Sequence, residues 1–392
     1  MCLPVHPVRL RSQCRWRRRR WDDRVAVLGL VMASACTPEP PLLATADWFV
    51  SPPADSGVGG RDSGAIGGTD TGVGPDVDDA ERPPGSPPEN WEFAPLGTSI
   101  WTSLMTDGEA VWVATLQGKR TLAFDISDGI EELPNPVELM PGDAVDDFTV
   151  TDISLLYLGD RFIVAASDPE ATGMILGAYG PSGVELVPPR RIITGSDAPT
   201  NDMKLVYRGD EVHVSHGADG PEKRFMVFTP DLVELQAVTT VVDPAYSSQL
   251  GCAVATDEGF LRVAGNYRNH GLVGARFDPD WQSTTTDDFL LPIPAEPNEW
   301  LWFSSGCARD PKTGVWYVAH QHMFDGDNAN SQSCIQVSRF DASWQYLDTH
   351  ELTARAGYTR PQLVIRADDL FVSFDRGEDD VQVAHARLDP DR

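Results

Sequence analysis

Acidic and imidazole side chains recur at two positions that keep a constant relation to a series of turn residues along the chain. One position, seven residues before each turn glycine, is filled by Trp101, Asp152, Asp202, Cys252 and Cys307. The other, at the end of the strand expected after each turn, is filled by Thr115, Ala166, His216, Gly265, His320 and Phe374, with Asp375 next to the last. Carboxylates and imidazoles held together can bind a divalent cation or perform general acid–base chemistry. The candidate binding residues are therefore Asp152, Asp202, His216, His320 and Asp375.

A structural role for the same residues is the alternative. Asp152 and Asp202 can cap turns by accepting hydrogen bonds from backbone N–H groups, while the histidines fill the centre of the fold. The chain contains no phosphate-cradling glycine loop, nucleophile elbow or zinc motif. The sequence therefore assigns no catalytic residue and names no reaction.

The longest expected loop, HQHMFDGDNANSQSC, spans residues 320–334 and holds a weaker metal candidate. Asp325 and Asp327 resemble the start of an oxygen-rich calcium loop, although the glycine and the distal glutamate of an EF-hand are missing. The cofactor held there would be a divalent cation such as calcium, and an ordinary solvated loop is the alternative. We expect His320 and His322 to point to opposite faces of a strand end, which makes them a poor pair of metal ligands.

The turn residues that define these positions belong to a sixfold repeat. They are Gly108, Gly159, Gly209, Gly259, Gly314 and Asp369, with successive separations of 51, 50, 50, 55 and 55 residues. Around each of them the chain is expected to form a strand, a Gly or Asp turn, an apolar strand, a loop, a strand ending in a large apolar residue, a turn and a final strand. Near-continuous apolarity in the second strand is typical of a strand that is buried on both faces.

Four strands in a unit of about 40–50 residues resemble the blade of a β-propeller. The resemblance covers residues 90–392 and implies an all-β domain of six four-stranded antiparallel blades around a central funnel. It also implies that the two recurring positions described above, which we call the first and the second column, gather at one end of this funnel. No signature of a propeller subfamily is present, so no subfamily activity is implied. The last unit lacks a fourth strand, and we expect residues 90–97 to supply it and close the ring.

A phrase within the repeat, RFDPDW at 276–281 and RFDASW at 339–344, is expected to have a structural purpose. The aromatic residue should end the third strand against a neighbouring blade, and the polar residues after it should form the hairpin turn. We expect Trp281 and Trp344 to cover the outer edges of their blades.

The first 35 residues resemble a secretory signal peptide, with a basic head and a short apolar run. Residues 33–36, ASAC, resemble the lipobox of bacterial lipoproteins, which implies that Cys36 becomes the lipidated first residue of the mature chain. Ala33 stands where the family prefers leucine, so ordinary cleavage is the alternative. Residues 36–89 are rich in Gly, Pro and Asp without apolar periodicity, and we expect a disordered tether there.

Charge and cysteine content limit the partners and the compartment. The chain has 31 Lys and Arg against 59 Asp and Glu, a formal net charge of −28. Such a field repels nucleic acid and anionic lipid and favours cations. Three cysteines follow the tether, and either Cys252 pairs with Cys307 across two blades or Cys307 pairs with Cys334.

These features favour a monomeric, cell-envelope-anchored binding module without catalytic activity. The protein would be exported and held at the outer membrane or cell surface by its lipid, or else be periplasmic or secreted. Its partners would be an envelope protein or a glycan, for which Trp300 and Trp302 can offer a stacking surface. One alternative is a metal-dependent hydrolase or lyase with its site at the funnel, and another is a pure scaffold.

Overall fold

The computed structural model describes most of the chain from Trp91 to Leu388. The residues described are 91–97, 101–117, 120–140, 152–168, 173–193, 201–217, 222–242, 247–266, 271–282, 289–293, 299–324, 333–376 and 380–388. Within these ranges the regular elements are 24 β-strands, so the predicted all-β class is confirmed. The predicted signal peptide and tether, with Cys36, lie outside the described residues.

The strands form six four-stranded sheets, one for each predicted blade. Blade 1 contains β2 (Thr102–Thr106), β3 (Val111–Gln117), β4 (Arg120–Asp125) and β5 (Val137–Met140). Blade 2 contains β6 (Ile153–Tyr157), β7 (Phe162–Asp168), β8 (Gly173–Tyr179) and β9 (Glu185–Ile193). Blade 3 contains β10 (Asn201–Arg208), β11 (Glu211–Gly217), β12 (Glu222–Phe228) and β13 (Glu234–Val242). Blade 4 contains β14 (Ser247–Thr256), β15 (Gly259–Asn266), β16 (Gly271–Phe277) and β17 (Phe289–Leu290). Blade 5 contains β18 (Trp300–Arg309), β19 (Trp316–Met323), β20 (Ser333–Phe340) and β21 (Tyr346–Glu351). Blade 6 contains β22 (Thr359–Arg366), β23 (Asp369–Asp375), β24 (Val381–Arg387) and β1 (Glu92–Gly97).

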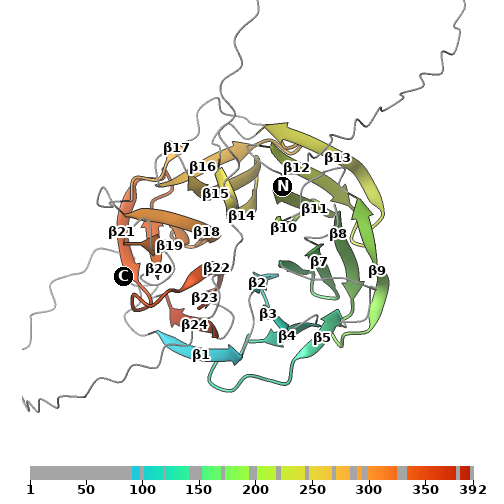
Figure 1. The fold of residues 1–392 in the computed structure, drawn as a ribbon, viewed down its shortest axis with the longest axis horizontal. Helices are drawn as coiled ribbons and strands as arrows, with labels where there is room; N and C mark the ends of the chain where they lie inside the picture. The colour runs from blue at the N-terminus through green and yellow to red at the C-terminus, as the bar shows by residue number, and fades with distance from the viewer. Residues whose placement is uncertain are drawn as a thin grey trace, which may run out of the picture. The chain divides into compact units, whose positions relative to one another are not determined.

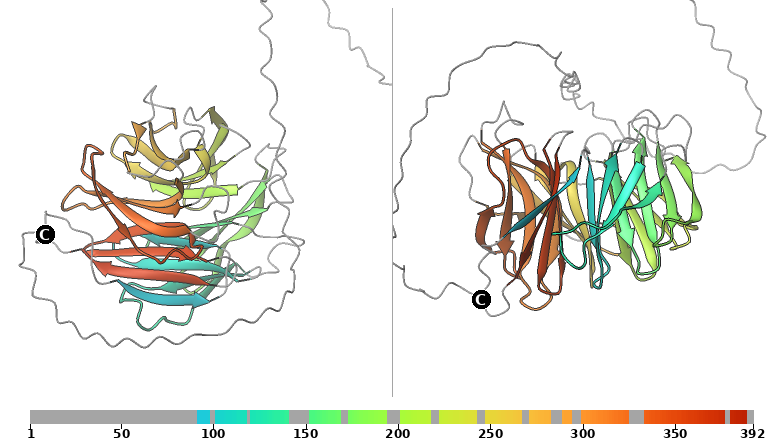
Figure 2. Two further views of the ribbon diagram at one scale, coloured as in Figure 1. Left: turned by 60° about the vertical axis from the view of Figure 1, so that its left-hand side comes forward. Right: turned by 90° about the horizontal axis from the view of Figure 1, so that it is seen from below.

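The first described strand closes the ring by joining the last blade. β1 pairs antiparallel with β24, from Glu92 opposite His385 to Gly97 opposite Val381. The sheet order β1-β24-β23-β22 places it as the outer strand of blade 6 (Figure 1). The two further views also show β1 beside β24 (Figure 2). The predicted closure by residues 90–97 is therefore confirmed.

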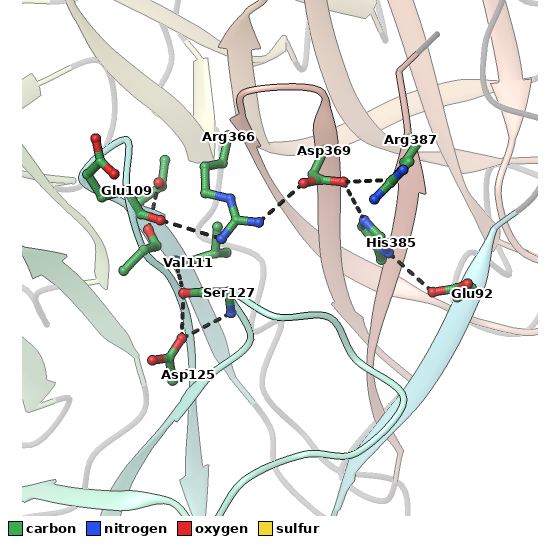
Figure 3. A network of polar contacts seen from close by, with 11 residues as sticks. Glu92, Glu109, Val111, Asp125, Ser127, Arg366, Asp369, His385 and Arg387 are labelled. Carbon is green, nitrogen blue, oxygen red and sulfur yellow. Dashed lines mark hydrogen bonds and ion pairs between the residues drawn. The ribbon is translucent and has the colours of Figure 1, made fainter.

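A polar network reinforces this closure. His385 of β24 lies between two carboxylates, with Nδ1 3.2 Å from Glu92 Oε2 and Nε2 3.0 Å from Asp369 Oδ1. Arg366 continues the chain of contacts from Asp369 to the backbone oxygen of Glu109 in blade 1 (Figure 3). These contacts link β1, β23 and β24 of blade 6 to the turn before β3 in blade 1.

The hydrophobic core is divided among the seams between neighbouring blades. Six clusters of buried side chains occupy the six seams, each drawing residues from two adjacent sheets. β19 is buried along all eight residues, as predicted for a strand covered on both faces. Close backbone approach helps at the seam of blades 5 and 6, where a Cβ on Gly306 would lie 2.1 Å from the Leu363 nitrogen.

The repeated aromatic phrase builds part of these seams. Phe277 is buried against residues of blade 3, and Phe340 against residues of blade 4. In the turn after Phe277, Asp278 Oδ1 accepts hydrogen bonds from the backbone nitrogens of Asp280 (2.9 Å) and Gln282 (2.8 Å). The predicted packing of the aromatic residues and the predicted turn are confirmed.

The expectation that the two tryptophans cover outer blade edges is wrong. Each adopts a positive φ at the end of its turn, 60° for Trp281 and 64° for Trp344. This backbone geometry directs the side chain into the seam: Trp281 is 1% exposed and stacks on Phe260 with 3.8 Å between ring centroids. Trp344 likewise stacks on Trp316 at 4.8 Å.

Inner strands are also linked directly from blade to blade. Ser103 Oγ accepts a hydrogen bond from the Leu155 nitrogen at 2.9 Å. A disulfide joins Cys252 to Cys307 across blades 4 and 5. The first of the two predicted pairings is therefore present, and Cys334 is a buried free thiol.

Candidate functional site

Two residues at the first position, Asp152 and Cys252, reach the next blade with their side chains. Asp152 is buried, and its Oδ2 accepts a hydrogen bond from the backbone nitrogen of Met203 in blade 3 at 3.1 Å. Cys252, at the equivalent position, reaches the next blade through its disulfide. Asp152 thus accepts a backbone N–H, as the structural alternative proposed, but it spans a seam. Asp202 lies in β10, and its side chain is outside the described part of the structure.

The two candidate histidines are deeply buried. His216 is 1% exposed in β11, and strand alternation places it with Val212 and Val214 on the face toward blade 2. Asp152 of blade 2 lies at the same seam, so the structure brings these two candidates to one side of blade 3. His320 is fully buried, and its Nε2 lies 2.8 Å from Ser338 Oγ.

The protonation of His320 follows from its surroundings. Burial, together with the nearby His322, lowers the pKa of His320 to about 3, because a charged ring is poorly solvated inside the protein. His320 is therefore a neutral hydrogen-bonding group near pH 7. A buried neutral imidazole held by a serine suits a structural role better than proton transfer to a ligand.

This burial gives a testable pH dependence. Unfolding would return the pKa of His320 from about 3 to the usual value near 6.5. The unfolded chain then binds more protons between these values, so stability falls as the pH drops through this window, by about 2 kcal/mol at pH 5. We expect His320→Gln to flatten the fall in denaturant midpoint between pH 7 and pH 5. Ser338→Ala, which removes the hydrogen-bond partner of His320 but no titrating group, is the control and should not flatten it.

The expectation that His320 and His322 point to opposite faces is wrong. Both lie within β19, and residues two apart in a strand share a face. His322 Nδ1 lies 2.9 Å from Gln336 Oε1, and its Nε2 lies 3.0 Å from Glu299 Oε2. The sequence reasoning missed Glu299, which precedes β18 and faces this histidine.

Asp375, the last residue of β23, belongs to a polar cluster with Thr359 and Arg360 at the start of β22. Its carboxylate is fully buried and accepts a 2.6 Å hydrogen bond from Thr359 Oγ1. Arg360 Nη1 lies 3.2 Å and 3.3 Å from the two carboxylate oxygens. Burial raises the pKa of Asp375 to about 6, although Arg360 and Thr359 oppose this increase. The group therefore titrates close to neutral pH.

Arg360 connects this carboxylate to the first column. Its guanidinium carbon lies 4.3 Å from the centroid of the Trp101 ring, which is a cation–π contact between blades 6 and 1. The arginine side chain is 29% exposed, whereas Asp375 is fully buried. The cluster thus combines two predicted positions, Trp101 and Asp375, with an arginine that the sequence reasoning missed.

Several predicted residues cannot be compared with the structure. Asp325 and Asp327 lie outside the described residues, and so do the side chains of Trp300 and Trp302. Within the described ranges, no group of three or more His, Cys, Asp or Glu side chains is arranged to hold a metal ion. The same ranges contain no helix long and apolar enough to cross a membrane.

Comparison with known proteins supports the fold and no more. No family model and no curated protein matches the chain. A subtype N10 neuraminidase-like protein of A/little yellow-shouldered bat/Guatemala/060/2010 is similar in structure, with a TM-score of 0.51 at 9% identity over 77% of this chain and 98% of that one. A member of the DUF4221 family from Bacteroides vulgatus has a TM-score of 0.48 at 10% identity, covering 77% of this chain and 97% of that one. An α-L-arabinofuranosidase catalytic domain from Coprinopsis cinerea has a TM-score of 0.45 at 8% identity, covering 60% and 90%.

Proposed function

We propose that the protein is an exported, lipid-anchored propeller that binds a ligand or a partner protein at the end of the blades where Asp375 lies, without catalysing a reaction. The observation that carries this proposal is the cluster of Trp101, Arg360 and Asp375. It places an aromatic ring beside a partly exposed charge, and both belong to strands or their ends. Binding sites commonly combine apolar surface with a few fixed polar groups in this way.

Two of the other candidate residues, Asp152 and His320, are poorly placed to act as a general acid or base. A general acid or base must reach the substrate proton. Asp152 and His320 are at most 2% exposed, and each has a bonding partner within the protein. Their contacts hold strands together, which is a sufficient reason for polar groups at these positions.

The proposed compartment is supported by cysteine chemistry in the propeller and by the resemblance of residues 33–36 to a lipobox. Disulfides persist in oxidising compartments, so the Cys252–Cys307 bond supports an exported protein. Lipidation at Cys36 would hold the protein at the outer membrane, and residues 36–89 would act as its tether. An envelope protein or a glycan is the class of partner that such a location offers.

The anchoring part of the proposal is tested with the full-length chain. We expect wild type to incorporate labelled palmitate and to enter the detergent phase of a two-phase extraction. Cys36→Ser should abolish both, while Cys334→Ser, which alters a buried thiol, should change neither. Palmitate incorporation that survives Cys36→Ser would contradict the lipid anchor.

The binding part predicts insensitivity to metal removal. We expect EDTA to leave the melting temperature within about 1 °C of its original value, because the contacts of Asp152, His320 and Asp375 are made by protein groups. We also expect no turnover of esters, lactones or glycosides. Turnover that EDTA abolishes would favour the metal-dependent hydrolase or lyase and overturn the proposal.

A further inference from the structure

We propose that Trp101, Thr359 and Asp375 form a subsite for a cationic group of the guanidinium or ammonium class, and that the chain's own Arg360 occupies this subsite. The inference rests on the proposed function, because it names the ligand chemistry of the same cluster. Arg360 is thus an internal stand-in for the ligand.

The first support is the backbone of Arg360. Its φ is 52°, in the left-handed region that L-residues avoid. The other described non-glycine residues with positive φ lie in hairpin turns, and they are Asp210, Leu232, Trp281, Trp344 and Ala367. Arg360 instead lies inside β22, where the ladder shifts between Thr359 and Gln362. Strained backbone away from a turn must be held by its contacts, and such strain concentrates at ligand sites.

The second support is the type of contact that holds the side chain. An aromatic face and a carboxylate are the two groups that recognise organic cations. Trp101 supplies the face at 4.3 Å, and both oxygens of Asp375 lie within 3.3 Å of Nη1. Thr359 Oγ1 donates to the same carboxylate and fixes its orientation.

The third support is access. Asp375 is fully buried, while the arginine side chain that contacts it is 29% exposed. We therefore expect truncation of Arg360 to open the buried carboxylate to solvent and to an external cation. A protein with 59 acidic and 31 basic residues also attracts cations to its surface.

Self-occupancy predicts weak binding by wild type and stronger binding once Arg360 is removed. An external cation must displace an intramolecular competitor, although the exchange releases the left-handed backbone. Binding also requires an ionised Asp375. Because the pKa of Asp375 is raised to about 6 in the wild type, the affinity of wild type for a cation should fall as the pH drops below this value, whereas an anion site at Arg360 would show the opposite sign.

The test is rescue of the full-length chain, in detergent, by methylguanidinium. We expect Arg360→Ala to bind this probe about tenfold more tightly than wild type, and adding Trp101→Ala or Asp375→Asn to remove about tenfold. Arg360→Lys, which refills the subsite, is the control and should resemble wild type. A folded Arg360→Ala chain that binds no more tightly than wild type, or whose affinity ignores Trp101→Ala, would overturn the inference.

A second measurement decides the matter if Arg360→Ala does not fold. Methylguanidinium should raise the melting temperature of wild type at tens of millimolar, and Asp375→Asn should abolish the increase. An increase that Asp375→Asn retains would overturn the inference. A peptide such as acetyl-Gly-Arg-Gly-amide distinguishes the sources: binding at least as tight as methylguanidinium indicates a protein side chain, and weaker binding indicates a small free cation. None of these variants touches Cys36 or tests turnover, so failure here is distinguishable from failure of the proposed function.

Discussion

Deleting residues 90–97 should unfold the whole propeller domain and not merely fray one blade. β1 contributes the outer strand of blade 6, with five paired positions against β24. It also buries Ala94 and Leu96 in the seam between blades 6 and 1. Loss of a buried leucine and of several ladder hydrogen bonds removes about 5 kcal/mol, which is comparable to the total stability of many domains.

The deletion also destroys the contact of Glu92 with His385 and exposes the edge of β24. We expect the loss of a cooperative melting transition near the wild-type temperature, followed by circular dichroism, and faster proteolysis throughout residues 101–388. A deletion of equal length at residues 60–67, in the expected tether, is the control and should melt like wild type. An unchanged transition after removal of residues 90–97 would mean that the ring does not depend on this strand.

The repeat and its closure were predictable because they depend on local patterns. Turn residues such as Gly209 and Gly314 adopt positive φ values of 58° and 75°, which glycine allows without strain. Their regular spacing marks each hairpin, and the missing fourth strand of the last unit points to residues 90–97 by elimination. These signals survive in one sequence because each is set by neighbours along the chain.

The direction of each column was not predictable from the same signals. Periodicity places Asp152 and Cys252 at equivalent positions, but whether they face the funnel or the next blade depends on how adjacent sheets pack. The structure shows both reaching across a seam. A contact between two blades is set by tertiary packing, which no local propensity encodes.

The contact between Arg360 and Asp375 could be predicted only in part from the strand pairing. The hairpin of β22 and β23 pairs Arg366 with Asp369, and counting outward would place Arg360 opposite Asp375. The bulge before Gln362 shifts this register, so that Thr359 pairs with Asp375 and Arg360 reaches the carboxylate from a left-handed backbone. The partner residue can therefore be read from the sequence, whereas the strain and the contact with Trp101 cannot.

Trp281→Ala should destabilise the domain by about 3–5 kcal/mol, the range for truncation of a large buried aromatic side chain. The ring is 1% exposed and stacks on Phe260 at 3.8 Å and on Phe225 at 4.1 Å. Its Nε1 donates a 3.1 Å hydrogen bond to His213 Nδ1. Truncation therefore opens a cavity between blades 3 and 4 and removes the donor to a buried imidazole.

Two control variants separate the effect of the aromatic stacking from the effect of the hydrogen bond, and from the effect of truncating any aromatic side chain. Trp281→Phe keeps most of the ring contact but has no hydrogen-bond donor. We expect it to lower the free energy of unfolding by about 1–2 kcal/mol, mainly because the buried His213 Nδ1 loses its hydrogen bond. Phe93→Ala truncates an aromatic side chain that is 49% exposed on β1 and should cost less than about 1 kcal/mol. Chemical denaturation of the three variants gives the comparison. If Trp281→Ala costs no more than Phe93→Ala, the repeated phrase does not serve to seal the seams, because its tryptophan would then contribute nothing that an exposed ring does not.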